Sequence, residues 1–239
     1  MLAENFLDMI VDNPQDGTFA VSRRLFTDPQ LFELELKNIF EGHWLYLAHA
    51  SQLPRPGDYF TTMMGRRSVL LTRDKGGKIH GFLNACAHRG TALCQSERGN
   101  KKHFVCPYHG WVYDAAGRNL DVKDRAAGGY PVQFLQRSQD LTPIARLAEY
   151  RGFIFGSLNA DVPSLEEHLG AAAGFIDLLV DQSPHGLEVL KGSATYRYHG
   201  NWKLQAENGI DAYHFTTVHQ NYVKVLQQRG ERADAQGKL

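Results

Sequence analysis

After an irregular start, hydrophobic residues recur at helical spacing, and the pattern then changes to short runs. Thr27-Asp28-Pro29 supplies an N-cap and a first-turn proline, and Gly42 suits a helix stop. Between these signals, apolar side chains lie three or four residues apart, as on one face of a helix. These side chains are Phe32, Leu36, Ile39 and Phe40. The pattern predicts one amphipathic helix over residues 29–40.

From about residue 44 to 158 the chain consists of short runs rich in Val, Leu, Phe, Tyr and Thr. Glycine-containing turn sequences at 74–78 and 114–117 separate such runs. We therefore expect a compact antiparallel β domain. Its predicted strands cover residues 59–64, 68–72, 79–84, 103–106, 111–113 and 153–158.

The last third of the chain returns to helical patterns. Ser164-Leu-Glu-Glu167 matches a capping box and predicts a helix running to about residue 180. Residues 187–198 indicate a strand, and a third helix is expected from Trp202 to about His219 despite Gly209. Residues 227–239 have almost no apolar content, so we expect them to be solvated or unpacked.

Composition narrows the class of protein. Hydrophobic residues make up 43% and charged residues 22%, which are ordinary globular values. The net charge is +0, so bulk attraction to nucleic acid or an anionic membrane is absent. No long apolar window occurs, and the N-terminus is acidic where a secretory signal is basic, which predicts a soluble, unsecreted chain. Three cysteines, an odd number, favour a reducing compartment and metal binding.

Two cysteine–histidine pairs carry the strongest chemical signal. Cys86-Ala-His88-Arg-Gly90 and Cys106-Pro-Tyr-His109-Gly-Trp111 each follow a predicted strand. Two thiolates and two imidazoles can hold a tetrahedral zinc or a [2Fe–2S] cluster with histidines on one iron. Because each loop supplies one ligand of each kind, the arrangement suits a cluster with the cysteines on the inner iron and the histidines on the outer one. A zinc-stabilised binding module stays open on the Cys2His2 composition alone.

These two loops resemble the Rieske motif of ring-hydroxylating oxygenases. The resemblance implies that Cys86, His88, Cys106 and His109 hold the cluster, with the histidines near the domain surface. Neutral imidazoles in place of two thiolates raise the reduction potential. We expect Trp111 to cover the cluster, and Tyr108 either to donate a hydrogen bond near a sulfur or to pack. Cys94, outside both loops, is expected to be a structural thiol.

A second group of chemical residues lies between Asn201 and His219. On an ideal helix Glu207, Asp211 and His214 share one face, so Asp211 can hydrogen-bond His214. A carboxylate on a ligating histidine fixes its tautomer. His219 follows His214 by five residues, which a regular helix would not aim at the same ion. We therefore expect a π-type bulge or a helix end between them.

Asp211-x2-His214-x4-His219 after Asn201-Trp-Lys resembles the mononuclear-iron segment of the same oxygenases. The resemblance implies that His214 and His219 are two ligands of a 2-His-1-carboxylate Fe(II) site. It also implies that Asp211 bridges this iron's histidine to a Rieske histidine of a neighbouring subunit in a trimer. The implied fold is α+β: an antiparallel β Rieske domain followed by the start of a helix-grip-like catalytic domain.

Phrases along the whole chain, among them Tyr150-Arg-Gly-Phe-Ile-Phe-Gly-Ser157, resemble the large subunits of benzoate, halobenzoate and anthranilate dioxygenases. The implied activity is NAD(P)H-dependent cis-dihydroxylation of an aromatic carboxylate by O2, within cytoplasmic catabolism of aromatic compounds. The implied partners are a small (beta) subunit, an NADH-dependent reductase or ferredoxin, and further large subunits in a trimer or alpha3beta3 assembly. The expected domains are an N-terminal segment (1–43), the Rieske domain (44–158) and an incomplete catalytic domain (159–239).

The chain departs from this family pattern in length. Family members run to roughly twice this length, and the third iron ligand, a carboxylate, comes from the other half. We therefore expect a chain truncated at its C-terminus, inactive by itself, in preference to a natural short protein. A stand-alone Rieske electron carrier, fitting residues 44–158, is the alternative function.

Overall fold

The structure is a computed structural model that describes Phe6 and residues 8–192 and 194–235. It divides into two compact units, residues 1–31 with 194–239 and residues 32–193, each of which is described by itself. The strands are β1 (Ile10–Asn13), β2 (Thr18–Val21), β3 (Leu45–His49), β4 (Asp58–Met64), β5 (Arg67–Arg73), β6 (Ile79–Leu83), β7 (Arg98–Asn100), β8 (Phe104–Val105), β9 (Val112–Tyr113), β10 (Asn119–Asp121), β11 (Arg146–Tyr150) and β12 (Phe153–Ser157).

Helices are short except at the C-terminal end of the chain. The α-helices are α2 (Arg24–Thr27), α3 (Pro29–Glu35), α4 (Val132–Gln136), α5 (Leu165–Leu169), α6 (Ala172–Val180), α7 (Trp202–Ile210), α8 (Phe215–Val218) and α9 (Gln220–Ala235). The other helical turns are the π-helix η1 (Leu36–Phe40) and the 3-10 turns η2 (Ala50–Gln52) and η3 (Arg125–Ala127). None of the helices in the described ranges has the length and apolar character needed to cross a bilayer.

The larger unit is built around an antiparallel sheet with strand order β6-β5-β4-β7. Successive side chains of a strand point to opposite faces, and here both faces are buried. One face contributes Tyr59, Leu70 and Phe82 to one hydrophobic core, and the other contributes Phe60, Val69 and Leu71 to a second. Burial on both faces explains the consecutive apolar residues Val69, Leu70 and Leu71 in β5.

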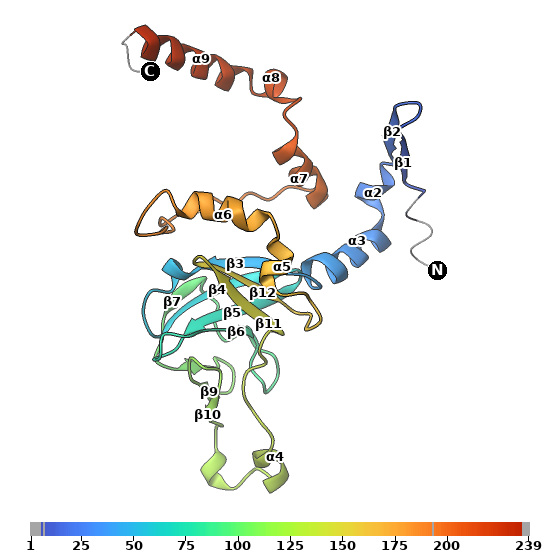
Figure 1. The fold of residues 1–239 in the computed structure, drawn as a ribbon. Coiled ribbons are helices and arrows are strands. Elements are labelled where there is room, and N and C mark those ends of the chain that lie inside the picture. The colour runs from blue at the N-terminus through green and yellow to red at the C-terminus, as the bar shows by residue number, and fades with distance from the viewer. Residues whose placement is uncertain (1–5, 7, 193, 236–239) are drawn as a thin grey trace. The chain divides into compact units, whose positions relative to one another are not determined.

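Two smaller antiparallel sheets cover the two faces (Figure 1). Sheet β11-β12-β3 closes the second core with residues such as Leu47 and Ile154. Sheet β10-β9-β8 closes the first core, to which Cys86, Cys106 and Tyr113 also belong. The two cysteine–histidine loops are therefore anchored in the packed core between the central sheet and sheet β10-β9-β8. All six strands predicted for this region are present, and the expected α+β class with antiparallel sheets is confirmed.

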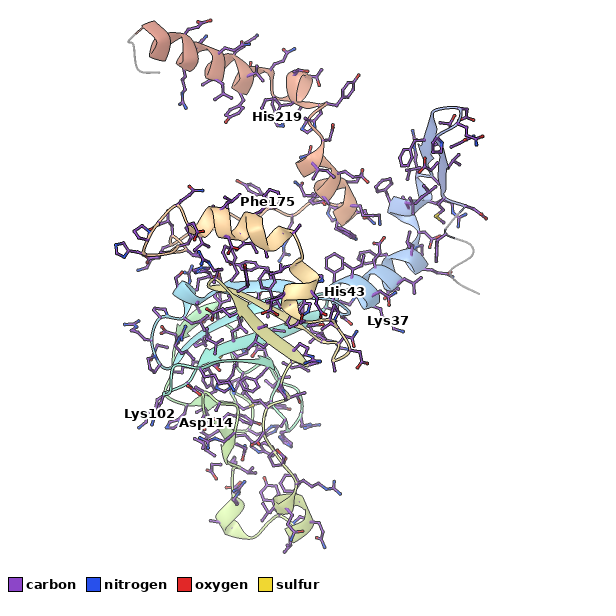
Figure 2. All side chains as sticks on the ribbon, viewed as in Figure 1. Lys37, His43, Lys102, Asp114, Phe175 and His219 are labelled. Carbon is purple, nitrogen blue, oxygen red and sulfur yellow. The ribbon has the colours of Figure 1, made fainter. Side chains whose placement is uncertain are left out.

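The capping box predicted at Ser164 is present. Ser164 Oγ accepts a hydrogen bond from Glu167 N at 3.2 Å, and Glu167 Oε2 accepts one from Ser164 N at 2.8 Å. The single helix expected up to residue 180 is wrong, because Gly170 leaves the helical region (φ 48°, ψ −128°) and separates α5 from α6. Phe175 on α6 is 75% exposed, so α6 presents apolar surface to solvent (Figure 2).

Residues 29–40 are helical as predicted, with the last turn widened into the π-helix η1. The irregular start is a wrong prediction, since β1 and β2 pair there as an antiparallel hairpin. Residues 187–198 were expected to form a strand, but those that the structure describes contain none. Leu190 is 83% exposed, and strand propensity without a pairing neighbour does not stabilise a strand.

The third predicted helix and the tail also differ from expectation. The helix over residues 202–219 is broken into α7 and α8 by an extended Asp211. The polar tail is helical up to Ala235 within α9, although its side chains are exposed up to Arg232, and residues 236–239 lie outside the described residues. The expected boundaries at 43/44 and 158/159 stay a prediction.

Candidate metal centres

The first cysteine–histidine loop leaves the end of β6 and is fastened by a buried amide. Asn84 Oδ1 accepts hydrogen bonds from the backbone N–H groups of Leu93 (3.1 Å) and Cys94 (3.0 Å), and its Nδ2 donates to Cys94 O at 2.7 Å. Within the loop, Cys86 N donates to Thr91 O at 2.9 Å. These bonds hold the cysteine and the returning chain in fixed positions.

The second loop repeats the hydrogen bonding of the first. Cys106 N donates to Trp111 O at 2.8 Å, and Gly110 N donates back to Cys106 O at 2.9 Å. In the first loop Gly90 N donates to the equivalent cysteine carbonyl at 2.8 Å. Gly90 (φ +74°) and Gly110 (φ +70°) both adopt left-handed conformations that a side chain disfavours. The near-identical turns therefore depend on the glycine that ends each motif.

The four predicted ligands come together in the structure. Cys86 and Cys106 are 3% and 2% exposed, whereas His88 is exposed and His109 half-buried. The two imidazoles face each other with 3.1 Å between their Nδ1 atoms and 4.6 Å between ring centroids. Two nitrogens on one tetrahedral metal at usual bond lengths lie about 3.3 Å apart. The site thus presents buried sulfurs on one side and paired nitrogens on the other.

Burial acts on the protonation of both kinds of predicted ligand. Burial is the main cause that raises the pKa of Cys86, and the neighbouring Cys106 thiol raises it further, while the Tyr113 hydroxyl lowers it. A bound metal removes this proton, because metal ligation requires the thiolate. Burial also lowers the pKa of His109, with His88, Arg89 and Lys123 adding to the effect, which favours the neutral ligating form.

The geometry also separates the cluster from the zinc alternative. Among the described residues, no three side chains of His, Cys, Asp or Glu surround a single point in the way one metal ion requires. A [2Fe–2S] cluster needs only two protein ligands for each iron, because sulfides supply the others. The paired nitrogens and the paired sulfurs satisfy this requirement. The four residues therefore fit a cluster better than one tetrahedral zinc.

Three aromatic side chains lie next to the predicted ligands. Trp111 stacks on His88 with 4.8 Å between centroids and an angle of 12°, in line with the expected cover. Tyr108 packs on His109 at 3.9 Å and is 61% exposed. The hydroxyl close to a sulfur belongs to Tyr113, whose Oη lies 3.2 Å from Cys86 Sγ and accepts from Ala87 N at 3.2 Å. Strand alternation after Trp111 was the available signal, since Tyr113 points to the same face.

Removing the Tyr113 hydroxyl is expected to lower the reduction potential of the cluster. A hydrogen bond to a ligating sulfur stabilises the reduced state more than the oxidised state, because the reduced cluster carries one more negative charge. A net loss of about 1 kcal/mol corresponds to about 40 mV for one electron in Tyr113→Phe. Spectroelectrochemical titration measures the shift.

Tyr130→Phe is the matched control for this prediction. Tyr130 packs against the same core and donates its hydroxyl to Lys123 O at 3.0 Å, away from the sulfurs. The reduction potential of the cluster in Tyr130→Phe should equal that in the unaltered chain. Equal potentials in Tyr113→Phe and Tyr130→Phe would show that the Tyr113 hydroxyl does not act on the cluster.

The second centre lies in the other compact unit. α7 ends at Ile210, and the extended Asp211 (φ −81°, ψ 115°) accepts hydrogen bonds from Tyr213 N at Oδ1 (2.7 Å) and from His214 Nδ1 at Oδ2 (3.0 Å). The expected Asp211–His214 contact is therefore present, although a turn brings it about and not a continuous helix. The His214 hydrogen bond is the main cause that lowers the pKa of Asp211, so this carboxylate is ionised at neutral pH.

His219 is brought near His214 by the break in the helix. The ring centroids lie 5.2 Å apart at an angle of 65°, with His219 in a non-helical conformation (φ −104°, ψ 26°) between α8 and α9. The bend expected from their spacing is present. Glu207, Asp211 and His214 line one open hollow of about 520 Å³. No described carboxylate joins the two histidines as a third ligand.

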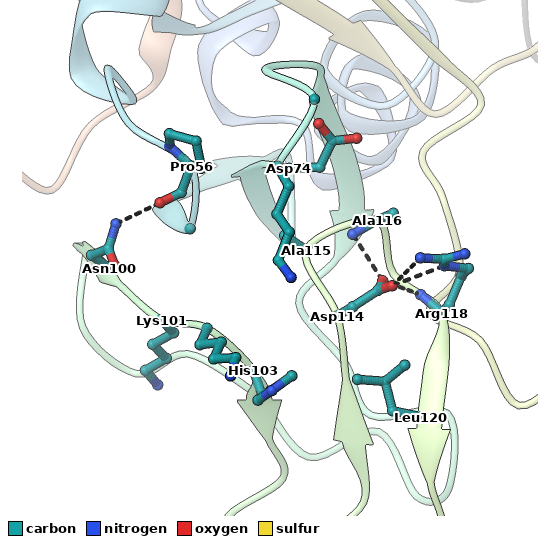
Figure 3. Close-up of a pocket in the computed structure, with 14 residues that line it drawn as sticks. Pro56, Asp74, Asn100, Lys101, His103, Asp114, Ala115, Ala116, Arg118 and Leu120 are labelled. Atoms are coloured by element: carbon teal, nitrogen blue, oxygen red, sulfur yellow. Dashed lines mark hydrogen bonds and ion pairs between the residues drawn. The ribbon is translucent and has the colours of Figure 1, made fainter.

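A further cavity of about 580 Å³ lies among turns of the larger unit (Figure 3). Its acidic groups are already paired: Asp114 Oδ2 accepts from Arg118 Nε at 2.8 Å, and Asp74 lies 2.7 Å from His80. Its basic lining comes from Lys75, Lys101, Lys102 and His103. None of the predicted ligands lines this cavity, so it is separate from both candidate centres.

Comparison with known proteins matches the two centres to two families. Residues 43–137 match the Rieske [2Fe-2S] domain, and residues 187–238 match the ring hydroxylating alpha subunit (catalytic domain). The toluate 1,2-dioxygenase subunit alpha of Pseudomonas putida is 52% identical over 95% of this chain. The chain combines a Rieske [2Fe-2S] domain with part of a ring hydroxylating alpha subunit catalytic domain. The first match contains the four predicted cluster ligands, and the second contains Asp211 and the two histidines predicted to bind the mononuclear iron.

Other members of this dioxygenase family are also similar. The 2-halobenzoate 1,2-dioxygenase large subunit of Burkholderia cepacia is 46% identical over 94% of this chain and 49% of its own length. The anthranilate 1,2-dioxygenase large subunit of Acinetobacter baylyi is 46% identical over 98% of this chain and 50% of its own length. Toluate dioxygenase alpha is covered over 51%. The chain spans about half the length of the curated relatives it matches.

The fold agrees with a solved member of the family. Naphthalene 1,2-dioxygenase from Rhodococcus sp. bound to indole aligns with a TM-score of 0.80 at 37% identity, over 92% of this chain and 49% of that chain. The predicted family and fold class are therefore confirmed. The catalytic-domain match over residues 187–238 gives no support to the alternative of a stand-alone electron carrier.

Proposed function

We propose that this chain acts in an aromatic-ring-hydroxylating dioxygenase that passes electrons from a Rieske cluster to a mononuclear iron. The observation that carries the proposal is the convergence of two buried cysteines with two histidines whose Nδ1 atoms lie 3.1 Å apart. The match to the ring hydroxylating alpha subunit supports the reaction class, and His214 and His219 would supply ligands for the iron.

The residues of the first centre have separate roles in this proposal. Cys86 and Cys106 would hold the inner iron within the core, and His88 and His109 would hold the outer iron at the surface. When bound, the cluster supplies single electrons, and the mononuclear iron supplies open coordination positions for O2. The exposed His88 ring is the group through which a partner could approach the cluster. Because both cysteines are buried, their sulfur atoms are shielded from water.

Asp211 orients the second centre. Its Oδ2 accepts from His214 Nδ1, which fixes the tautomer and leaves Nε2 free to bind a metal. His214 and His219 would be the iron ligands in this chain. The Asp211 side chain is exposed beside its contact with His214. Its carboxylate could therefore also contact a histidine of a neighbouring subunit. The bridging role of Asp211 between two subunits is part of the proposal.

The substrate class proposed is an aromatic carboxylate, and the product a cis-diol. Support comes from the names of the similar proteins, which refer to toluate, 2-halobenzoate and anthranilate. The proposed partners are a small subunit, an NADH-dependent reductase or ferredoxin, and further copies in a trimer, all in the cytoplasm. We also propose the Rieske domain at 44–158 and catalytic-domain residues at 159–239.

The test is anaerobic reconstitution of the chain with Fe²⁺ and sulfide. We expect brown protein with about two iron and two acid-labile sulfides in the cluster of each chain. O2 uptake with benzoate, a halobenzoate and anthranilate, measured on a large subunit that also contains the third iron ligand, with the partner subunit and a reductase, separates an oxygenase from an electron carrier. Colourless protein without labile sulfide would contradict the proposal.

A further inference from the structure

Trp111 carries a buried hydrogen-bond donor without a partner. Its side chain is 1% exposed, and Nε1 has no acceptor among the described residues. Trp44, the other buried indole of this unit, is 7% exposed and donates its Nε1 to Pro163 O at 2.9 Å. Buried N–H groups without an acceptor are rare because they lose their bond to water without replacement. The Trp111 donor therefore needs a specific explanation.

The position of the indole narrows the possible acceptors. Trp111 belongs to the same packed core as Cys86 and Cys106, and it lies parallel to the His88 ring at 4.8 Å. Phe134 of α4 packs edge-on against the indole at 6.1 Å and 69°. Trp111 Nε1 has no water-accessible surface of its own. An acceptor held within the ligand site would satisfy this donor.

Of the two cysteine sulfurs, Cys86 Sγ already has a donor. Tyr113 Oη lies 3.2 Å from Cys86 Sγ. A [2Fe–2S] cluster adds two bridging sulfides, which are negatively charged acceptors lying between the cysteines and the histidines. An indole in contact with the His88 ligand and packed in the cysteine core borders this region. We propose that Trp111 Nε1–H donates a hydrogen bond to a bridging sulfide of the cluster and so raises its reduction potential.

This role makes Trp111 a positioning and tuning residue. Reduction adds one electron to the cluster and breaks no bond, so the negative charge on the sulfides increases. A fixed N–H donor stabilises this added charge, because it is held in place before the electron arrives. The inference rests on the proposed cluster and on no other part of the proposed function.

The experiment compares three forms of the reconstituted chain: unaltered, Trp111→Phe, and a form with β-(3-benzothienyl)alanine at position 111. Benzothienylalanine keeps the shape of the indole and replaces the N–H by sulfur. At the midpoint potential of the unaltered chain, we expect both changes to lower the ratio of reduced to oxidised cluster about fivefold. This corresponds to a midpoint potential lower by about 40 mV, at 59 mV for each tenfold change in the ratio. Dithionite supplies the electrons in the titration.

Resonance Raman spectra in H2O and D2O give a second readout. The bridging Fe–S modes of the unaltered chain should shift on deuteration, and this shift should shrink in both altered forms. Trp44→Phe is the matched control and should keep the unaltered potential and shift. Should Trp111→Phe lose the cluster, the benzothienyl form decides, because its volume is unchanged.

Two results would overturn the inference in distinguishable ways. If the benzothienyl form keeps an intact cluster with an unchanged potential and deuterium shift, then Trp111 donates no hydrogen bond to the cluster. The proposed cluster itself would stand. If the unaltered chain contains no acid-labile sulfide, both the proposed cluster and the proposed hydrogen bond are wrong.

Discussion

Replacing His88 or His109 by alanine is expected to abolish the visible and EPR spectrum of the Rieske cluster while the chain stays folded. Each histidine would supply one of the two protein ligands of the outer iron, and alanine offers no donor. The fold should tolerate the change, because His88 is exposed and His109 half-buried, and surface substitutions cost about 0.5 kcal/mol or less. Absorption spectra, sulfide analysis and far-UV circular dichroism measure the three properties.

The chain offers a matched control for each ligand type. His103 is exposed and lies close in sequence to the second loop, yet it lines the separate cavity of Figure 3, so His103→Ala should keep the spectrum. Cys94 is buried, and burial raises the pKa of its thiol to about 11, which fits a structural role. Cys94→Ala should keep the cluster, whereas Cys106→Ala should lose it. Labile sulfide that persists in both histidine variants would show that the ligand assignment is wrong.

Asp211→Ala is expected to keep both metal centres and to lose turnover in the assembled oxygenase. Without Oδ2, the His214 ring loses the 3.0 Å hydrogen bond that fixes its tautomer, and the proposed bridge to the neighbouring subunit is removed. Loss of such a partner typically costs 10–100-fold in activity or metal affinity. Product formation per O2 consumed, at saturating Fe²⁺ and with iron analysis, measures the effect.

Asp211→Asn and Glu207→Gln separate charge from geometry at this centre. Both change a carboxylate into an amide, and both residues line the same hollow. Only Asp211 contacts His214 in the structure. We expect Asp211→Asn to lose turnover and Glu207→Gln to retain it. Unchanged coupled product formation in Asp211→Ala would remove the bridging role.

Elements stabilised by local signals were predictable from the sequence. The capping box at Ser164 appears as expected, because both of its hydrogen bonds join residues within one turn. Strands β4, β5 and β6 of the central sheet were also predicted, since they contain buried apolar residues such as Val69, Leu70 and Leu71, whereas the exposed strand β7 was not.

Elements that depend on distant partners were missed or wrongly assigned. β3 pairs with β12, which lies far along the chain, and its short run was not singled out. Residues 187–198 have strand composition but meet no pairing strand among the described residues. The break at Asp211 was not predicted, because the Asp211 turn is closed by its own side chain, which accepts from Tyr213 N.

The sequence by itself indicated the candidate ligands of the two proposed centres. Cysteine, histidine and aspartate at these spacings, with a glycine closing each cysteine loop, leave few other uses for the residues. Only the tertiary structure decided which neighbours act on them: Tyr113 and not Tyr108 reaches the Cys86 sulfur, and the Trp111 N–H is buried without a partner. The reason is physical, since the capacity to bind a metal depends on the donor atoms of a residue, whereas contacts to those atoms depend on how two sheets pack around one core.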